Sequence, residues 1–245
     1  LAMEPALKPD IAGGWHSEFD WHLRPDMLMT AWRKNLTRRG LIIEEHAKLV
    51  DFEISGKTIT HVNTIQGKFA ADAFILATGA WAPQTAKQLG LHLPVQPGKG
   101  YSITMERPGI CPSMPCVLYE KSMVVTPWKS GYRLGGTMEF SGYSTSLNAR
   151  RLSKLVKGAA DYMKEPITKE KTGQPVIEEW TGLRPMTYDD MPIIDRSPKQ
   201  ENLVIATGHG MLGLTLATGT GKIVADMIYG KTPEINIHPF GLDRF

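Results

Sequence analysis

The pattern of apolar and polar positions changes several times along the chain. Residues 1–25 show neither a helical nor a strand period and are predicted to be loop. A helix with a partly apolar face is expected from Pro25, which suits a first turn, to Gly40. The segments LIIEEHAKLVDFEI and KTITHVNTI then alternate and turn at Ser55-Gly56, which indicates a hairpin of two strands.

A different pattern begins with DAFILATGAW (72–81), which is apolar and runs into Thr78-Gly79. Such a strand is typical of a parallel sheet that is buried on both faces. Between Pro94 and about residue 140, short alternating segments broken by Pro and Gly favour an antiparallel sheet, and a helix is expected over 148–163. The strand NLVIA then leads into a last helix that ends at Gly230.

Together these elements predict an α/β fold with parallel strands and an inserted, mainly antiparallel sheet (α+β). The expected domains are residues 1–93, which include the hairpin, an inserted antiparallel domain over 94–180, and a return to the first domain over 181–245.

The segment IATGHGMLGLTLATGTG (205–221) contains Gly208-x-Gly210-x-x-Gly213, the spacing of a dinucleotide-binding fingerprint. That fingerprint requires a second strand after its helix, with an acidic residue about 20 positions on. Here only 15 residues follow Gly230, two of them proline. The motif is therefore not expected to bind a pyrophosphate.

A strand, a glycine turn and a helix N-terminus still let the backbone approach a flat ligand closely. The helix dipole stabilises a nearby negative charge by about 0.3–2 kcal/mol. The N1–C2=O edge of a flavin, which becomes anionic on reduction, suits such a place. The alternative is a glycine-rich turn that serves only tight packing between helix and strand, and this stretch alone does not separate the two.

Composition narrows the function classes. The net charge of +3 is spread along the chain, and its densest basic cluster, at 33–39, is typical of a solvated helix face, so nucleic-acid binding is not expected. No apolar run reaches the roughly 18–20 residues that cross a bilayer. Cys111 and Cys116 fit neither a redox CxxC nor a zinc half-site, so free thiols and no metal are predicted.

Three segments together resemble the flavin-dependent D-amino-acid oxidase superfamily, and most closely its D-amino-acid dehydrogenases. They are FILATGAW (74–81), WTGLRPMTYDDMPII (180–194) and GHGMLGLTLATGTGKIVADMI (208–228). The likeness covers essentially the whole chain. The family's N-terminal strand–GxGxxG–helix, which holds the ADP half of FAD, has no counterpart, so the chain resembles a C-terminal portion. The resemblance implies that 1–93 and 181–245 are parts of an FAD-binding domain and that 94–180 is a substrate domain.

The resemblance places FAD contacts at two sites. Thr78, Gly79 and Trp81 end the predicted parallel strand where the family's backbone meets the cofactor, although Trp81 is equally explained by core packing. The second site follows the flavin edge through Gly208, His209, Gly210, Met211, Leu212 and Gly213. His209 by itself is interpreted as a hydrogen-bonded turn residue rather than as a catalytic base.

Arg184 in GLRP is the main catalytic and substrate-binding candidate. A planar guanidinium grips a carboxylate through two parallel hydrogen bonds, and Pro185 restricts the backbone of Arg184. The resemblance puts the family's carboxylate-binding arginine at this position; the alternative is a structural ion pair. Tyr101 and Tyr119 are candidate substrate hydroxyls, for which sheet packing is the alternative.

Asp190 and Asp195 stand where the family commonly has glycine. Either substitution alters the expected turn near the flavin, and this weakens the assignment of the substrate.

The leading hypothesis is an FAD-dependent oxidoreductase that oxidises the Cα–N bond of a D-amino acid in amino-acid catabolism and passes electrons to a quinone. The expected location is cytoplasmic, with the full-length protein peripheral to the inner face of a membrane. One alternative is an oxygen-using amine oxidase of the glycine, sarcosine or proline type. Another is a non-catalytic fragment or subunit whose partner supplies the ADP-binding half, in cis or in trans.

Overall fold

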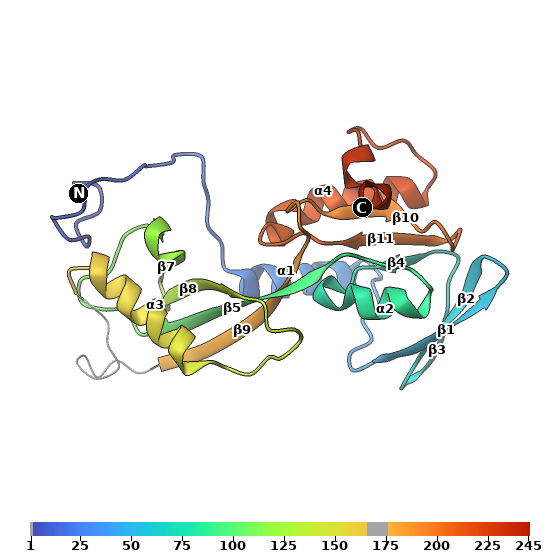
Figure 1. Ribbon diagram of the computed structural model, residues 1–245, viewed down its shortest axis with the longest axis horizontal. Helices are drawn as coiled ribbons and strands as arrows, with labels where there is room; N and C mark the ends of the chain where they lie inside the picture. Colours follow the sequence, from blue (N-terminus) through green and yellow to red (C-terminus); the bar gives the residue numbers. More distant parts are fainter. Residues whose placement is uncertain (1, 166–175) are drawn as a thin grey trace. The chain divides into compact units, whose positions relative to one another are not determined.

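The computed structural model describes residues 2–165 and 176–245 (Figure 1), which form two compact units. Unit 1 is drawn from Leu1–Glu45, Tyr101–Thr137 and Ser146–Thr181, and unit 2 from His46–Gly100, Met138–Thr145 and Gly182–Phe245. In this division residues 1–45 share a unit with the antiparallel sheet, and the expected domain boundaries at 93/94 and 180/181 stay predictions. The assignment of cofactor and substrate binding to separate domains stays a prediction.

A five-stranded sheet of order β6-β7-β8-β5-β9 contains the strands of unit 1. Antiparallel pairing joins β7 to β6 and to β8, and β5, β8 and β9 each begin in one unit and end in the other. The bounds are β5 (Gln96–Met105), β6 (Cys116–Leu118), β7 (Met123–Trp128), β8 (Gly131–Glu139) and β9 (Val176–Met186). The predicted antiparallel sheet is confirmed.

Helix α3 (Ala149–Tyr162) confirms the helix expected over 148–163. It begins at Asn148, whose side-chain oxygen accepts from the backbone N–H of Arg150, because the first N–H groups of a helix have no partner within it. Leu152 and Leu155 pack into one core with residues of β5 to β8. Figure 1 shows α3 beside these strands.

Helix α1 (Pro25–Arg38) is also confirmed, and Gly40 follows it with a φ of +98°. Its side chains are exposed except for half-buried Leu28 and Trp32. Arg24, directly before α1, donates to both carboxylate oxygens of Asp26 at 2.9 and 2.6 Å.

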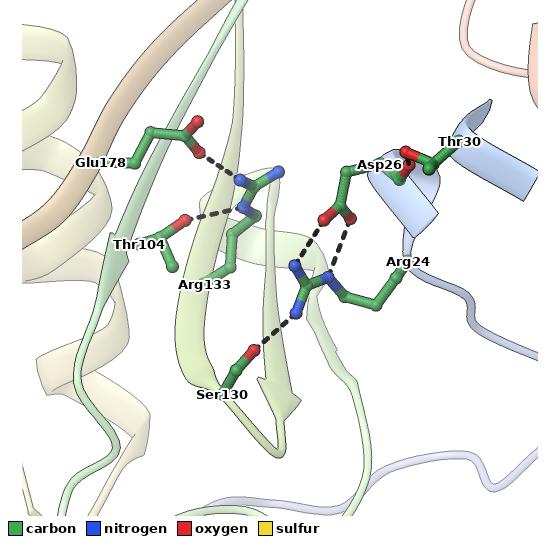
Figure 2. Close-up of polar contacts among 7 residues, drawn as sticks. All are labelled: Arg24, Asp26, Thr30, Thr104, Ser130, Arg133 and Glu178. Carbon is green, nitrogen blue, oxygen red and sulfur yellow. Dashed lines mark hydrogen bonds and ion pairs between the residues drawn. The ribbon is translucent and has the colours of Figure 1, made fainter. Parts of the chain in front are cut away.

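Two arginines share one aromatic ring in unit 1. Arg24 donates to Ser130 Oγ at 2.5 Å, and Arg133 of β8 donates to Thr104 Oγ1 at 2.9 Å and pairs with Glu178, as Figure 2 shows. The guanidinium carbons of Arg24 and Arg133 lie 4.4 and 4.5 Å from the centroid of the Trp128 ring. We call Trp128, Arg24 and Arg133 the tryptophan clamp.

Unit 2 contains two three-stranded sheets, β1-β2-β3 and β10-β11-β4. In the second sheet β11 pairs antiparallel with β10 and parallel with β4. The bounds are β1 (Leu49–Ser55), β2 (Thr58–Thr64), β3 (Gly67–Ala70), β4 (Phe74–Leu76), β10 (Ile193–Arg196), β11 (Leu203–Thr207), α2 (Ala82–Gln88) and α4 (Gly213–Ile228). Mixed helix and sheet with parallel and antiparallel pairing confirms the predicted fold class.

Strand β11 is buried on both faces because it lies between two apolar clusters. Leu203 and Ile205 pack with α2, and Val204 packs with Val224 and other residues of α4 on the opposite face. Figure 1 shows α2 and α4 on the two sides of this sheet.

Three expectations about unit 2 are corrected. The hairpin turn at Ser55-Gly56 is right, but the first strand begins at Leu49, and the sequence did not predict β3. Strand β4 is not buried on both faces: it has three residues, and Ile75 is 50% exposed. Within the described residues β4 is an edge strand with β11 as its neighbour, so its apolar sequence overstates its burial.

Candidate active site

Two glycine turns meet at the carboxyl ends of β4 and β11. Because these strands are parallel neighbours, the turns after Leu76 and Thr207 lie at the same edge of the sheet. Thr207 Oγ1 donates to the carbonyl oxygen of Gly79 at 2.9 Å and joins the turns directly. Ligands of open α/β sheets bind outside such an edge.

The glycine loop (208–212) requires glycine at two positions. Gly208 has a φ of +74° and Gly210 one of +52°, in the left-handed region that side chains disfavour. A Cβ at Gly208 would also lie 2.8 Å from Thr187 Cγ2. The N–H of Gly210 donates to the carbonyl oxygen of Pro185 at 2.9 Å, so the loop is tied to β9 next to Arg184.

His209 is held against α4 rather than left free. Its Nε2 lies 2.9 Å from Thr220 Oγ1, and burial lowers the pKa of the imidazole below its ordinary value. Both observations agree with a neutral, hydrogen-bonded turn residue. Met211 and Leu212 are exposed directly before α4 begins at Gly213.

Arg184 lies in β9 against the backbone of β5. A Cβ on Gly100 would overlap the guanidinium group, so glycine leaves the space that Arg184 fills. Arg184 Nη1 lies 3.7 Å from the sulfur of Met138. Burial lowers the pKa of Arg184, since a thioether is a weak acceptor and solvates a cation poorly.

The remaining predicted residues lie in different settings. Tyr101 is 1% exposed in the core of unit 1, and Tyr119 is 82% exposed, so their substrate contacts stay predictions. Trp81, in the short 3₁₀ helix Gly79–Trp81, is 45% exposed, which argues against the core-packing alternative. Thr78 is exposed, with its Oγ1 3.5 Å from Thr85 Oγ1.

Both aspartates that depart from the family pattern have a structural setting. Asp190 adopts a φ of +57°, a conformation that glycine would take without strain. Asp195 accepts hydrogen bonds from the N–H groups of Arg196 and Leu242 at 2.7 and 2.8 Å.

Sequence reasoning missed the contacts that hold the segment after β9. Arg244 donates to Asp189 at 2.8 Å and to the carbonyl oxygen of Met191 at 2.9 Å, and so holds the segment that follows β9. The Arg244 guanidinium keeps the pKa of Asp189 below its ordinary value. These partners are 55 residues apart, and no local pattern reveals such a pair.

An apolar groove of about 410 Å³ opens between β4 and α4. Ile75 and Ala77 line one side, and Ala217, Val224 and Ile228 line the other. The half-exposed Ile75 faces this groove, on the side of β4 that its neighbour Val204 shares with α4.

Residues 1–227 match the family DAO, FAD dependent oxidoreductase. The chain belongs to this family. A D-amino acid dehydrogenase of Bradyrhizobium diazoefficiens is 34% identical over 251 residues, which are 100% of this chain and 58% of the relative. One of Cereibacter sphaeroides is 36% identical over 267 residues, 100% of this chain and 56% of the relative. The chain thus spans a little over half of these DAO-family relatives and matches a C-terminal portion of them.

Solved structures agree on the DAO fold. Glycine oxidase from Geobacillus kaustophilus has a TM-score of 0.75 and 25% identity, with 89% of this chain and 57% of that chain covered. L-proline dehydrogenase from P. horikoshii has a TM-score of 0.76 at 20% identity, with 89% and 58% covered, and supports the fold alone.

The residues present fit the flavin end of FAD. Gly79 has a φ of +56° and open space where a Cβ would stand, and the exposed residues of the glycine loop precede the N-terminus of α4. The sheet edge therefore offers backbone surface to a flat ring and a positive helix end to its polar edge. Within the described residues, the chain provides no second strand–glycine–helix unit beside β4 for the ADP end.

Proposed function

We propose that this chain is the flavin-contacting and substrate-binding portion of an enzyme that oxidises the Cα–N bond of a D-amino acid. The observation that carries the proposal is the position of Arg184. Its guanidinium occupies the space beside Gly100 that a Cβ would fill, and its neighbour Pro185 accepts a hydrogen bond from Gly210 of the glycine loop. The anion-binding group and the cofactor loop therefore belong to one connected backbone arrangement.

Arg184 binds the α-carboxylate through two parallel hydrogen bonds and fixes the orientation of Cα. FAD, when bound, accepts the hydride that leaves Cα. Gly208 and Gly210 let the loop backbone approach the reacting face closely, and neutral His209 adds no positive charge that would repel an ammonium group. The amine loses its proton to solvent before oxidation.

We propose that the ADP end of FAD is held by a strand–glycine–helix unit supplied in cis or in trans. Three observations support this proposal. Among the described residues β4 is an edge strand, an apolar groove lies beside it, and the relatives are longer than this chain. The present chain alone is then expected to bind FAD weakly. Intact mass and the visible spectrum of the purified chain test this, because stoichiometric flavin on a lone chain would contradict it.

The electron acceptor separates two candidate functions. The relatives are dehydrogenases by name, so we propose a quinone acceptor, which implies peripheral membrane association of the full-length protein. The second candidate is an oxidase acting on a small amine acid, favoured by the similarity to glycine oxidase. In the described part of the chain, none of the helices has the length and apolarity that a bilayer crossing needs.

The deciding experiment uses the full-length protein with D-alanine and either a quinone analogue or oxygen. Turnover with the quinone and no peroxide supports the dehydrogenase, and stoichiometric peroxide supports the oxidase. Arg184→Lys keeps the charge but loses the planar fork, and is expected to lower kcat/KM about 100-fold. The matched control is Arg39→Lys, at an exposed position, which should leave kcat/KM unchanged.

A further inference from the structure

Two glycines of β5 face side chains of β8 and β9. Gly98 and Gly100 are two residues apart and therefore share one face of the strand. A Cβ at Gly98 would lie 2.6 Å from Met138 Sδ and 2.7 Å from Met186 Cγ, and one at Gly100 would overlap Arg184. Neither glycine has a positive φ, so space rather than backbone conformation requires glycine here.

One thioether borders the guanidinium of Arg184, and a second, that of Met186, lies beside the first over Gly98. Met138 Sδ lies 3.7 Å from Nη1 of Arg184. The side chain of Met186 reaches from Gly98 to the glycine loop, where its Sδ and Cε lie 3.7 and 3.6 Å from the Cβ position of Gly210. The cation thus has soft apolar neighbours on the side that leads to the loop.

The backbone before Met138 is strained. Thr137 adopts a φ of +61°, a costly conformation for a β-branched residue. Strain of this kind persists where the surrounding structure holds a residue in place, and here it immediately precedes a side chain at the candidate site.

We propose that Met138 and Met186 form the subsite for the substrate side chain, and that Gly98 and Gly100 are positioning residues that make room for the two methionines and for Arg184. The inference rests on the proposed carboxylate binding by Arg184. A carboxylate held about 2.8 Å from the guanidinium nitrogens brings the Cα substituent next to Met138. The substrate class is then an amino acid with an unbranched apolar side chain.

The physical reasons are polarity and shape. A polar side chain placed between two thioethers loses hydrogen bonds to water and gains weak acceptors in exchange. A β-branched side chain has a fixed, bulky Cβ, whereas an unbranched one can follow the flexible methionines into a narrow space. D-methionine should therefore bind better than D-glutamine of similar length, and D-norvaline better than its isomer D-valine.

The test measures binding to the present chain by NMR, with ¹³C-methyl methionine and ¹⁵N-arginine labels. Met138→Leu and Met186→Leu assign the two methyl signals. Each of the four amino acids should shift the Nε signal of Arg184, and D-methionine and D-norvaline should also shift both methyl signals. Their dissociation constants should be about tenfold lower than those of D-glutamine and D-valine.

Variants connect these preferences to the named residues. Gly100→Ala should weaken all four ligands at least about tenfold, since it displaces the guanidinium. Its matched control, Gly219→Ala, adds a methyl where nothing lies within 4 Å and should change no affinity. Met138→Gln should abolish the preference for D-methionine over D-glutamine and keeps the test valid if Gly100→Ala does not fold.

The NMR measurements distinguish a failure of the proposed function from a failure of the proposed subsite. An Arg184 signal that responds to none of the amino acids would overturn the proposed function and the subsite with it. An Arg184 signal that responds to all four with equal affinities, unchanged by Met138→Gln, would overturn the subsite alone.

Discussion

The arginines of the tryptophan clamp and Arg184 have different surroundings. In unit 1, the guanidinium of Arg24 donates to Asp26, and this hydrogen bond raises the pKa of Arg24. In unit 2, Arg184 lies against Gly100 and the thioether of Met138, and burial lowers its pKa.

The two settings favour different roles for the cations. A guanidinium that already has a carboxylate and an aromatic face contributes to the folded structure. A guanidinium that has lost water to weakly polar neighbours gains most from an anion that arrives later. Residue type alone does not distinguish these cases, whereas the surroundings do.

The largest expected effect comes from replacing Arg184 with an apolar residue of similar length. Arg184→Met should weaken carboxylate binding more than about 100-fold, since the bidentate pair is lost. It should leave the melting temperature of the ligand-free chain unchanged or raise it, because a buried charge is removed. Calorimetric binding and thermal unfolding measure both effects, and a strongly destabilised variant would make Arg184 a structural residue like those of the clamp.

The clamp should show the reverse behaviour. Trp128→Leu removes a ring that is 9% exposed and the surface on which two guanidinium groups lie. We expect a loss of about 3 kcal/mol in the free energy of unfolding, measured with urea. Carboxylate binding at Arg184 should not change. Trp21→Leu, at an exposed ring of the same unit, is the control and should have little effect on either quantity.

Relief of backbone strain beside the candidate site should have a smaller effect of opposite sign. Asp190→Gly should stabilise unit 2 by about 0.5–1 kcal/mol, because glycine adopts the observed φ of +57° without penalty. Asp72→Gly, at an exposed position with ordinary φ, should not stabilise. Equal behaviour of the two variants in urea unfolding would show that the conformation of Asp190 carries no strain.

The smallest expected effect is a pH dependence at His209. Burial lowers the pKa of His209 in the folded chain, so protonation favours the unfolded state. The stabilisation that neutral His209 contributes is fully present above the ordinary histidine pKa of about 6.5. It is lost as the pH falls through the lower pKa that His209 has in the folded chain. His209→Gln should therefore reduce the loss of stability between pH 7.5 and pH 5.5. An unchanged loss would assign this pH dependence to other groups.

Local signals explain what the sequence predicted well. The helix caps, the Ser55-Gly56 turn and the strand–glycine–helix arrangement at the end of the chain depend on residues close in sequence. The burial of β4 was overestimated because an apolar run shows only that a strand can pack against other apolar groups. It does not report whether a second neighbour lies beside the strand.

The site was predictable only in part for a similar reason. Arg184 and the glycine loop belong to motifs, and the structure joins them through Gly210 and Pro185. The role of Gly100 as a neighbour of Arg184 was not predicted, because the two residues are 84 positions apart and on different strands. The ring of Trp128 likewise meets Arg24 only in the folded chain.

The hydrogen bond from Gly210 to Pro185 has a consequence for protein engineering. A substitution that shifts β9 is expected to move the glycine loop as well, and a change in that loop is expected to displace Arg184. Mutations in the two segments are then expected to be epistatic, with joint effects on specificity and electron transfer that differ from the sum of the separate ones. Libraries that vary β9 and residues 208–212 together would sample improvements that neither segment reaches by itself.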